Sequence, residues 1–239
     1  MIFPASGDFV ASASHGKSVS DSGQFGVRIW DVKTGLCQRT LGYHLRSLSE
    51  VIFSPNGSLV VSTSWDKTIR LFNSRTGQCL HTLHCDSNPL SVALSPNSSL
   101  VAAGLGDTMV HLWNVQTGQC QQTFKGHSDS TSSVVFSLDG KFVVSTHDQT
   151  VRLWNIQTGQ CGYTLRRHTH SVKIVVLCLD GQLLASASSD GIVRIWDLRT
   201  GQCQYILGGH TSWAEGVSML PQSLEWFLAG PDKLEHALL

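Results

Sequence analysis

The stretch GQLLASASSDGIVRIWDLRTGQCQYILGGH, residues 181–210, decides the fold of this chain. Three short segments within it, at 183–188, 192–197 and 202–207, are apolar or alternate between apolar and polar residues, and Ser-Asp-Gly and Arg-Thr-Gly turns separate them. Such runs between glycine-containing turns predict strands joined as hairpins. With a further strand expected at 172–177, the unit is a sheet of four antiparallel strands. A sheet this small cannot bury both of its faces alone and needs neighbours of the same kind.

The neighbours are present, because the chain repeats this unit. An aromatic residue recurs at intervals of 42, 41, 41 and 42 residues: Trp30, Phe72, Trp113, Trp154 and Trp196. A cysteine follows each of them by seven residues: Cys37, Cys79, Cys120, Cys161 and Cys203. An aspartate at a hairpin turn precedes the last four by six residues: Asp66, Asp107, Asp148 and Asp190. Repeats of about 40 to 45 residues with four strands each are typical of propeller blades.

The motifs Trp30-Asp31, Trp196-Asp197, Gly126-His127 and Gly209-His210 make the chain resemble the WD-repeat family of β-propellers over almost its whole length. The resemblance implies an all-β fold, a single β-propeller of four-stranded antiparallel blades spanning residues 1–239. Units are expected at about residues 1–41, 49–83, 90–124, 132–165 and 172–207, with a degenerate sixth unit at 214–239. The first lacks its inner strand and the last its outer strand. We therefore expect a fragment of a larger propeller, or a six-bladed ring with an incomplete seam.

The first unit also has an unusually long loop. The chain runs for 18 residues between Ser12 and Trp30, whereas the matching segment between Ser62 and Phe72 has 10. The extra residues lie at 15–26 and are mostly small or polar. Loops longer than their hairpin requires are usually functional or disordered. This loop is therefore a candidate for partner contact and for early proteolysis.

The composition excludes several classes of function. The 239 residues include 17 basic and 17 acidic side chains, for a formal net charge of zero. Without a basic block, no binding to nucleic acid through its phosphates is expected. The longest apolar run, 174–179, is too short for membrane insertion, and no signal peptide is evident. Seven cysteines, five of them at one repeated position, favour free thiols in an intracellular, cytoplasmic protein.

The WD-repeat resemblance also implies a structural network inside the blades, formed by a histidine, a serine, the turn aspartate and the tryptophan. Such a network satisfies polar groups that the stacked sheets bury. The matching residues form one complete set, a second with one residue deleted before its aspartate, and a third without the tryptophan: His168, Ser186, Asp190 and Trp196; His127, Ser145, Asp148 and Trp154; His44, Ser62 and Asp66. In the third unit Asp86 and Ala103 replace the histidine and the serine, and the first unit has no histidine.

Other chemistries are less well supported by these residues. Serine, histidine and aspartate together suggest a hydrolase, but a group that recurs in blade after blade requires no nucleophile. His81, His84 and Cys85 lack the Cys-x-x-Cys partner of a zinc site, and the repeated cysteines are spaced one per blade. Residues 16–18, Gly-Lys-Ser, lack the first glycine of a phosphate-binding loop. We therefore expect no catalytic residue, no metal and no cofactor.

The remaining candidate site is a surface that could bind a partner. In the WD-repeat family, the loops from outer to inner strands share one face with the hairpins between second and third strands, and this face commonly receives peptides. Trp65 directly precedes a turn aspartate, where an indole is either a binding hot spot or packed on a neighbouring loop. The candidate partner-binding residues are Trp65, His147, Ser189, Arg46, Glu50, His170 and Trp213.

These features predict a non-catalytic protein–protein interaction scaffold or recognition module, whose partners are other proteins or peptides. The Thr-Gly-Gln-Cys turns resemble those in the repeat domains of fungal NACHT-type NTPases, which implies an upstream nucleotide-binding domain in a longer parent protein. Three alternatives stay open. They are an adaptor subunit of a multiprotein complex, for example in mitochondrial fission or signalling; a propeller hydrolase, which needs a polar cluster in the central channel; and a truncated gene product without a function of its own.

Overall fold

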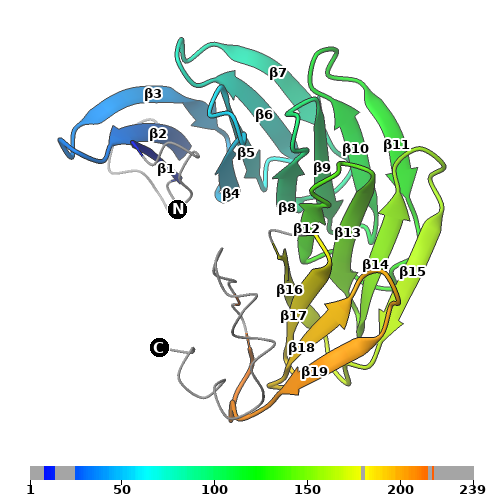
Figure 1. Ribbon diagram of the computed structural model, residues 1–239. Helices are drawn as coiled ribbons and strands as arrows, with labels where there is room; N and C mark the ends of the chain where they lie inside the picture. Colours follow the sequence, from blue (N-terminus) through cyan, green and yellow to red (C-terminus); the bar gives the residue numbers. More distant parts are fainter. Residues whose placement is uncertain (1–7, 14–24, 179–180, 215–216, 218–239) are drawn as a thin grey trace.

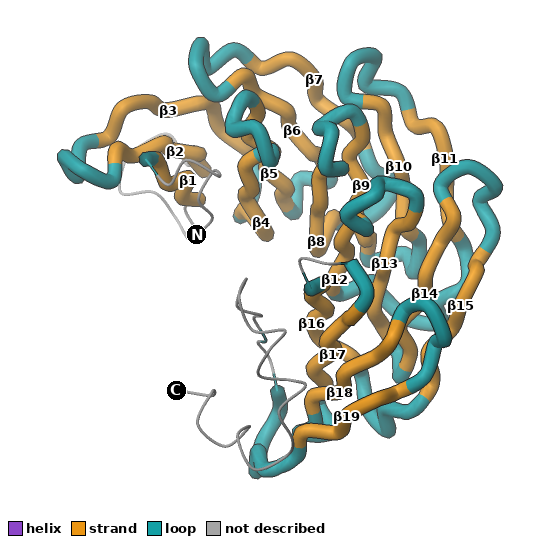
Figure 2. The backbone as a smooth tube through the Cα atoms, viewed as in Figure 1, coloured by secondary structure: helices purple, strands orange, loops and turns teal. Residues whose placement is uncertain are grey.

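The computed structural model describes residues 8–13, 25–178, 181–214 and 217. All regular structure in this part of the chain is β-strand, with loops and turns between the strands (Figure 2). The strands form one three-stranded and four four-stranded antiparallel sheets. The sheets stand side by side along an arc, and their innermost strands face a common centre (Figure 1). The prediction of an all-β fold of WD-type blades is confirmed.

Each strand pairs with the next one along the chain, which gives every sheet a simple up-and-down order. From the first sheet to the fifth, the strands are β1 (Phe9–Ala13), β2 (Phe25–Asp31) and β3 (Cys37–His44); β4 (Leu48–Phe53), β5 (Leu59–Ser64), β6 (Thr68–Asn73) and β7 (Cys79–His84); β8 (Pro89–Leu94), β9 (Leu100–Leu105), β10 (Val110–Asn114) and β11 (Cys120–Phe124); β12 (Ser133–Phe136), β13 (Phe142–His147), β14 (Thr150–Asn155) and β15 (Cys161–Arg166); and β16 (Val172–Leu177), β17 (Leu183–Ser188), β18 (Val193–Asp197) and β19 (Cys203–Leu207).

The first sheet differs from the expected boundaries. Strand β2 starts at Phe25, within the loop expected at 15–26, because Phe25 and Gly26 pair with the end of the long strand β3. Residues 1–3, the rest of the loop at 15–26 and nearly all of the sixth unit at 214–239 lie outside the described residues.

The core lies between neighbouring sheets, because both faces of each sheet are apolar. In β6, Phe72 packs with Val27 and Ile29 of the first sheet. Ile69 and Leu71 of the same strand point the other way and pack with the third sheet, as the two-residue period of a strand requires. Three tryptophans repeat the placement of Phe72 and face the preceding sheet: Trp113, Trp154 and Trp196. The regular aromatic spacing in the sequence therefore marks the interfaces between blades.

A tight turn sets the start of each outer strand. In the third sheet, Asn114 Oδ1 accepts hydrogen bonds of 2.9 Å from the backbone N–H groups of Gln116 and Thr117. Gly118 follows with φ +68°, a left-handed conformation that favours glycine. The pairing of β10 with β11 then shifts by a bulge, so that Cys120 lies opposite Trp113. All five sheets have this bulge, which places a cysteine at the start of every outer strand.

Candidate protein-interaction face

The fifth sheet contains the full predicted polar network. Ser186 Oγ on β17 lies 2.8 Å from His168 Nε2 and accepts a 2.8 Å hydrogen bond from the Trp196 indole on β18. His168 Nδ1 lies 2.9 Å from Asp190 Oδ2 in the turn between these strands. Arg194 adds an ion pair of 3.2 Å to the same carboxylate oxygen, which the sequence motif did not indicate. The structure thus brings together all four residues predicted from the sequence.

The second and fourth sheets hold two variants of this network. In the second, His44 bridges Ser62 at 2.8 Å and Asp66 at 3.0 Å, and Phe72 supplies no indole donor. In the fourth, Ser145 Oγ is 2.7 Å from both His127 Nε2 and Trp154 Nε1. The one-residue deletion shortens the turn before β14, and His127 Nδ1 lies 3.6 Å from Asp148 Oδ2. Both sets are therefore present, the fourth with a longer histidine–aspartate separation.

The first and third sheets contain only part of the network, or none of it. The Trp30 indole donates a 2.7 Å hydrogen bond to Ser12, so the first sheet keeps the tryptophan–serine part of the network without a histidine. The sequence places Ser12 in register with Ser62, but this bond was not predicted because the first unit has no network histidine. In the third sheet, Ala103 replaces the serine and Gly104 follows it, and Thr131 from the next sheet packs closely over that glycine.

The network histidines are held neutral near pH 7. Burial lowers the pKa of His127 to about 4, against a weaker opposing effect of Asp148. It also lowers the pKa of His44 and His168, whose aspartate partners offset part of this effect. A neutral imidazole has one N–H and one acceptor nitrogen, which suits a position between a hydroxyl and a carboxylate.

The Ser–His–Asp arrangement resembles the catalytic triad of a hydrolase. Whether a substrate can reach the serine therefore decides between catalysis and a structural role. Ser186 is fully buried, and its oxygen already contacts both His168 and the Trp196 indole. A nucleophile must be exposed to the substrate and lie beside an oxyanion site. Ser62 and Ser145 are also fully buried. The geometry therefore supports a role in holding strands and loops together.

The networks fasten two kinds of loop to each other at one end of the sheets. Asp66 Oδ2 accepts a 3.0 Å hydrogen bond from the backbone of Leu45, in the connection from β3 to β4. Asp190 makes the matching 3.0 Å contact with Thr169. Each buried aspartate therefore holds an outer-to-inner connection against the hairpin between second and third strands. We call the surface made by these two kinds of loop the loop face.

An apolar pair projects from the loop face at the second sheet. Trp65 is 49% exposed in the turn between β5 and β6, and Leu45 is 77% exposed in the neighbouring connection. A 3.0 Å backbone bond from Trp65 to Ser47 joins the two loops. The exposed Arg46 lies beside Leu45 in the chain. Sequence reasoning selected Trp65 and Arg46 but missed Leu45, which follows the network histidine His44 in the chain.

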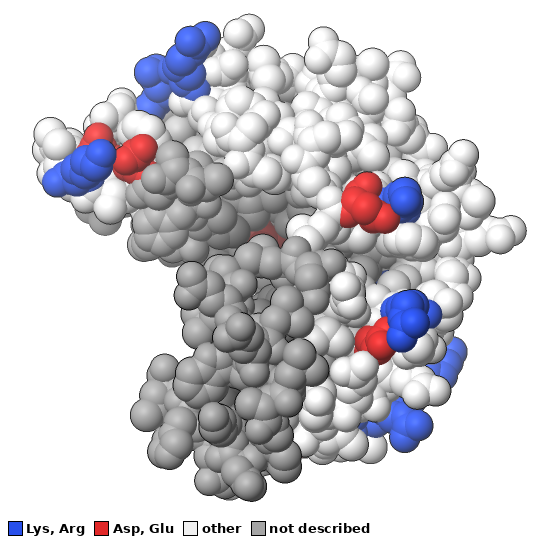
Figure 3. All heavy atoms as spheres, in the orientation of Figure 1, with Lys and Arg blue, Asp and Glu red and all other residues white. Residues whose placement is uncertain are grey.

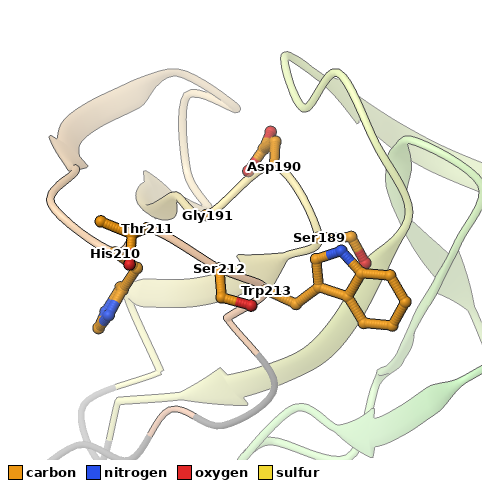
Figure 4. Close-up of a pocket in the computed structure, with 7 residues that line it drawn as sticks. All are labelled: Ser189, Asp190, Gly191, His210, Thr211, Ser212 and Trp213. Carbon is orange, nitrogen blue, oxygen red and sulfur yellow. The ribbon is translucent and has the colours of Figure 1, made fainter.

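A second group lies at the fifth sheet, where an open hollow of about 300 Å³ is lined by the β17–β18 turn and by the segment after β19. Ser189 belongs to its wall, and His210 and Trp213 stand on different sides of it (Figure 4). Trp213 is 63% exposed, and the Lys173 ammonium lies 5.8 Å from its ring centroid. His170 is exposed on the preceding loop.

Two of the predicted surface residues are not on the exposed loop face. Glu50 lies on the inner strand β4, and its Oε2 accepts a 2.8 Å hydrogen bond from the Val92 N–H of the next sheet. His147 is buried at the end of β13, with its Nε2 3.1 Å from Asp129 Oδ2. Neither side chain therefore lies on the exposed part of the loop face, because one links adjacent inner strands and a loop covers the other.

Charged side chains do not gather into a patch on the face seen in Figure 3, and the described residues form no metal-binding group. In Figure 3, lysine, arginine, aspartate and glutamate side chains lie as isolated groups separated by wide uncharged areas. Within the described ranges, no three histidine, cysteine, aspartate or glutamate side chains are placed to hold a metal ion. The described strands and loops also include no helix long and apolar enough to cross a membrane.

Radially arranged antiparallel sheets, several of which contain the same polar network, define a repeat protein of the propeller type. The profile of the WD40 family, described as "WD domain, G-beta repeat", matches residues 35–73, 77–114, 118–155 and 159–197. The matches cover more than half of the chain, which therefore belongs to the WD40 repeat family. Each matched segment runs from a turn before an outer strand to the third strand of the next sheet, so each one spans a blade interface.

Several characterised proteins share short segments with this chain. Nuclear distribution protein PAC1 of Arthroderma benhamiae is 41% identical over 70 residues, which are 29% of this chain and 13% of PAC1. The periodic tryptophan protein 2 homolog of Neurospora crassa is 38% identical over 95 residues, 39% of this chain and 10% of the relative. Protein tipD of Dictyostelium discoideum is 40% identical over 57 residues, 24% of this chain and 9% of tipD. The matched segments are thus small parts of these relatives.

Proposed function

We propose that this chain is a non-catalytic recognition module that binds a segment of a partner protein on its loop face. The observation that carries the proposal is the exposed pair Leu45 and Trp65, held on two loops that the His44–Asp66 network fixes. Tryptophan is enriched at the energetic centres of interfaces, and rigid loops lose little conformational freedom on binding. Membership of the WD40 family supports the same conclusion, because WD-repeat proteins bind other proteins.

Hydrolysis is the candidate from a different class, and we disfavour it. The three Ser–His–Asp sets repeat from blade to blade, and their serines are fully buried. An adaptor role in a larger complex is compatible with the proposed binding surface, which would then bind another subunit of that complex. The seven cysteines, all in described residues, form no disulfide, which favours a reducing compartment inside the cell. An upstream nucleotide-binding domain stays a prediction.

Selection from a random peptide library tests the proposal without a known partner. We expect the immobilised chain to enrich peptides that share an apolar anchor residue. Binding of a synthetic copy should weaken at least tenfold with Trp65→Ala, which corresponds to the loss of about 1.4 kcal/mol or more. Leu138→Ala is the matched control, because Leu138 is also an exposed apolar residue but lies in the β12–β13 turn at the opposite end of the sheets. Failure to enrich peptides, or equal losses for both variants, would contradict the proposal.

A further inference from the structure

The outer strands carry a series of free thiols at one structural position. Each of the five repeated cysteines begins an outer strand, and its Sγ lies 3.3–3.7 Å from the carbonyl oxygen of the residue two positions later. Four of the five are exposed: Cys37, Cys79, Cys120 and Cys161. The repeat therefore gives these thiols closely similar surroundings, so a difference at one of them stands out.

Cys120 differs from the other four in its cross-strand neighbour. Its Sγ lies 3.8 Å from His111 Nδ1 on β10. The other four sheets have an arginine at the position of His111: Arg28, Arg70, Arg152 and Arg194. Among the described residues, Cys120 is the repeated cysteine whose sulfur has a side-chain nitrogen within hydrogen-bonding distance.

The surroundings of His111 direct its Nδ1 towards the thiol. The ring stacks on Trp113, two residues along the strand, with the centroids 5.5 Å apart and an interplanar angle of 21°. Nε2 is buried and has no hydrogen-bond partner among the described residues. Nδ1, in contrast, has both the Cys120 thiol and the Thr123 hydroxyl at 3.3 Å as possible donors. An imidazole with its proton on Nε2 accepts from both.

We propose that Cys120 is a thiol-modification site, at which His111 acts as the base and small-molecule disulfides are the reactants. The Cys120 S–H proton moves to His111 Nδ1, and the sulfur electron pair attacks one sulfur of the disulfide R–S–S–R. The S–S bond breaks, a new protein–S–S–R bond forms, and the leaving thiolate takes the proton from His111 as R–SH. Cys120 is oxidised and the departing thiol is reduced, so the exchange needs no other oxidant.

The charges around His111 keep this base available near neutral pH. Burial lowers its pKa, the carboxylates of Asp107 and Asp86 oppose this shift, and Lys125 adds to it. The lowered pKa keeps the His111 ring neutral at pH 7, and in the tautomer with its proton on Nε2 the free nitrogen is Nδ1. A neighbouring base helps most under these conditions, because it removes the proton that blocks the nucleophile.

Oxidised glutathione and peptide mass spectrometry test the site on the whole chain. Mixed disulfide formation at each cysteine is measured over time at pH 7.4, with Cys79 as the internal reference. We expect Cys120 to react several-fold faster than Cys79. The ratio should fall towards one at pH 9.5, where hydroxide in the solvent competes with His111 for the thiol proton and the neighbouring base gives less advantage. A difference due to exposure alone would persist at the higher pH.

Two substitutions exchange the neighbours of the thiols. His111→Arg introduces the residue of the other sheets and should reduce the rate at Cys120 to that of Cys79. Arg70→His should raise the rate at Cys79, and an unchanged rate at Cys161 would show that general unfolding of the chain does not explain this gain. Equal rates at Cys120 and Cys79 in the parent chain, or an unchanged rate at Cys120 in a folded His111→Arg variant, would overturn the proposal.

Discussion

The Trp196 indole donates a 2.8 Å hydrogen bond to the fully buried hydroxyl of Ser186. This bond joins the third strand of the fifth sheet to the second, and His168 and Asp190 extend it to the loops. Every polar group along this path is removed from water, so the loss of one member leaves its neighbours without a partner. The contribution of the network to stability can therefore be measured by substituting one of its members.

Asp190→Ala should lower the free energy of unfolding by about 1–3 kcal/mol, the usual effect of leaving a buried polar partner unsatisfied. Asp107→Ala is the matched control, because it removes an aspartate from the same turn in a sheet where Ala103 and Asp86 replace the network serine and histidine. Asp107 Oδ1 accepts a hydrogen bond from the Met109 backbone, which limits the expected loss to that of a turn. Urea unfolding measures both variants, and equal losses would show that the network adds nothing.

Acid should destabilise the fold through its buried histidines. Burial lowers the pKa of His127 from 6.5 to about 4. The unfolded chain binds this proton near pH 6.5 and the folded chain only near pH 4, so stability is full above pH 6.5. It falls as the pH drops through this window, by on the order of 3 kcal/mol from His127. His44 and His168 change stability in the same direction.

Urea unfolding between pH 7.5 and pH 4.5 measures this dependence. His127→Gln should flatten the slope in that window, although it lowers stability at neutral pH by removing the contact with Ser145. His170→Gln changes an exposed histidine and should keep the slope of the parent chain. If His127→Gln and the parent lose stability in parallel, burial of this ring is not the cause.

Glu50 should stabilise the contact between the second and third sheets. Its carboxylate accepts the Val92 N–H at 2.8 Å, whereas Ser91 and Ser133 do the same for the next two sheets. Glu50→Ala leaves the buried Val92 N–H without an acceptor and should cost about 1–3 kcal/mol. Glu50→Gln keeps an acceptor oxygen and should be far less damaging.

The pH dependence separates the charge of Glu50 from its hydrogen bond. Burial raises the pKa of Glu50 above its ordinary value of 4.5, so the unfolded chain ionises first as the pH rises. This group therefore costs the fold stability as the pH rises from 4.5 through the raised pKa. Glu50→Gln should remove that cost, and its stability relative to the parent should increase from pH 5 to pH 7.5. A constant difference would contradict the assignment.

The sequence predicted the repeat and most of the network, because both depend on fixed spacings. From Phe72 onward the aromatic residues face the preceding sheet, and the cysteines begin the outer strands, since each cysteine follows its aromatic residue by seven positions. The bond between Ser12 and Trp30 was not predicted, because the first unit has no histidine to complete the motif, although Ser12 is in register with Ser62.

Surface positions were harder to predict, since exposure depends on neighbours from other units. The sequence predicted Glu50 in or near a loop, but the next inner strand supplies an N–H that donates to its carboxylate. The sequence predicted His147 as a variable residue at a turn, but the loop that contains Asp129 covers its side chain. Leu45 was overlooked because a single apolar residue in a loop has no periodic signal, and only its tertiary setting makes it prominent.

Hydrogen–deuterium exchange of the chain with a library-selected peptide tests the central claim, recognition by the loop face, most directly. We expect slower amide exchange at residues 44–48 and 64–68, around Leu45 and Trp65, when the peptide is bound. The hairpins at the opposite end of the sheets, including 54–58 and 137–141, should exchange at the same rate with and without it. Protection confined to those opposite hairpins or to the outer strands, with no change at 44–48 and 64–68, would contradict the account.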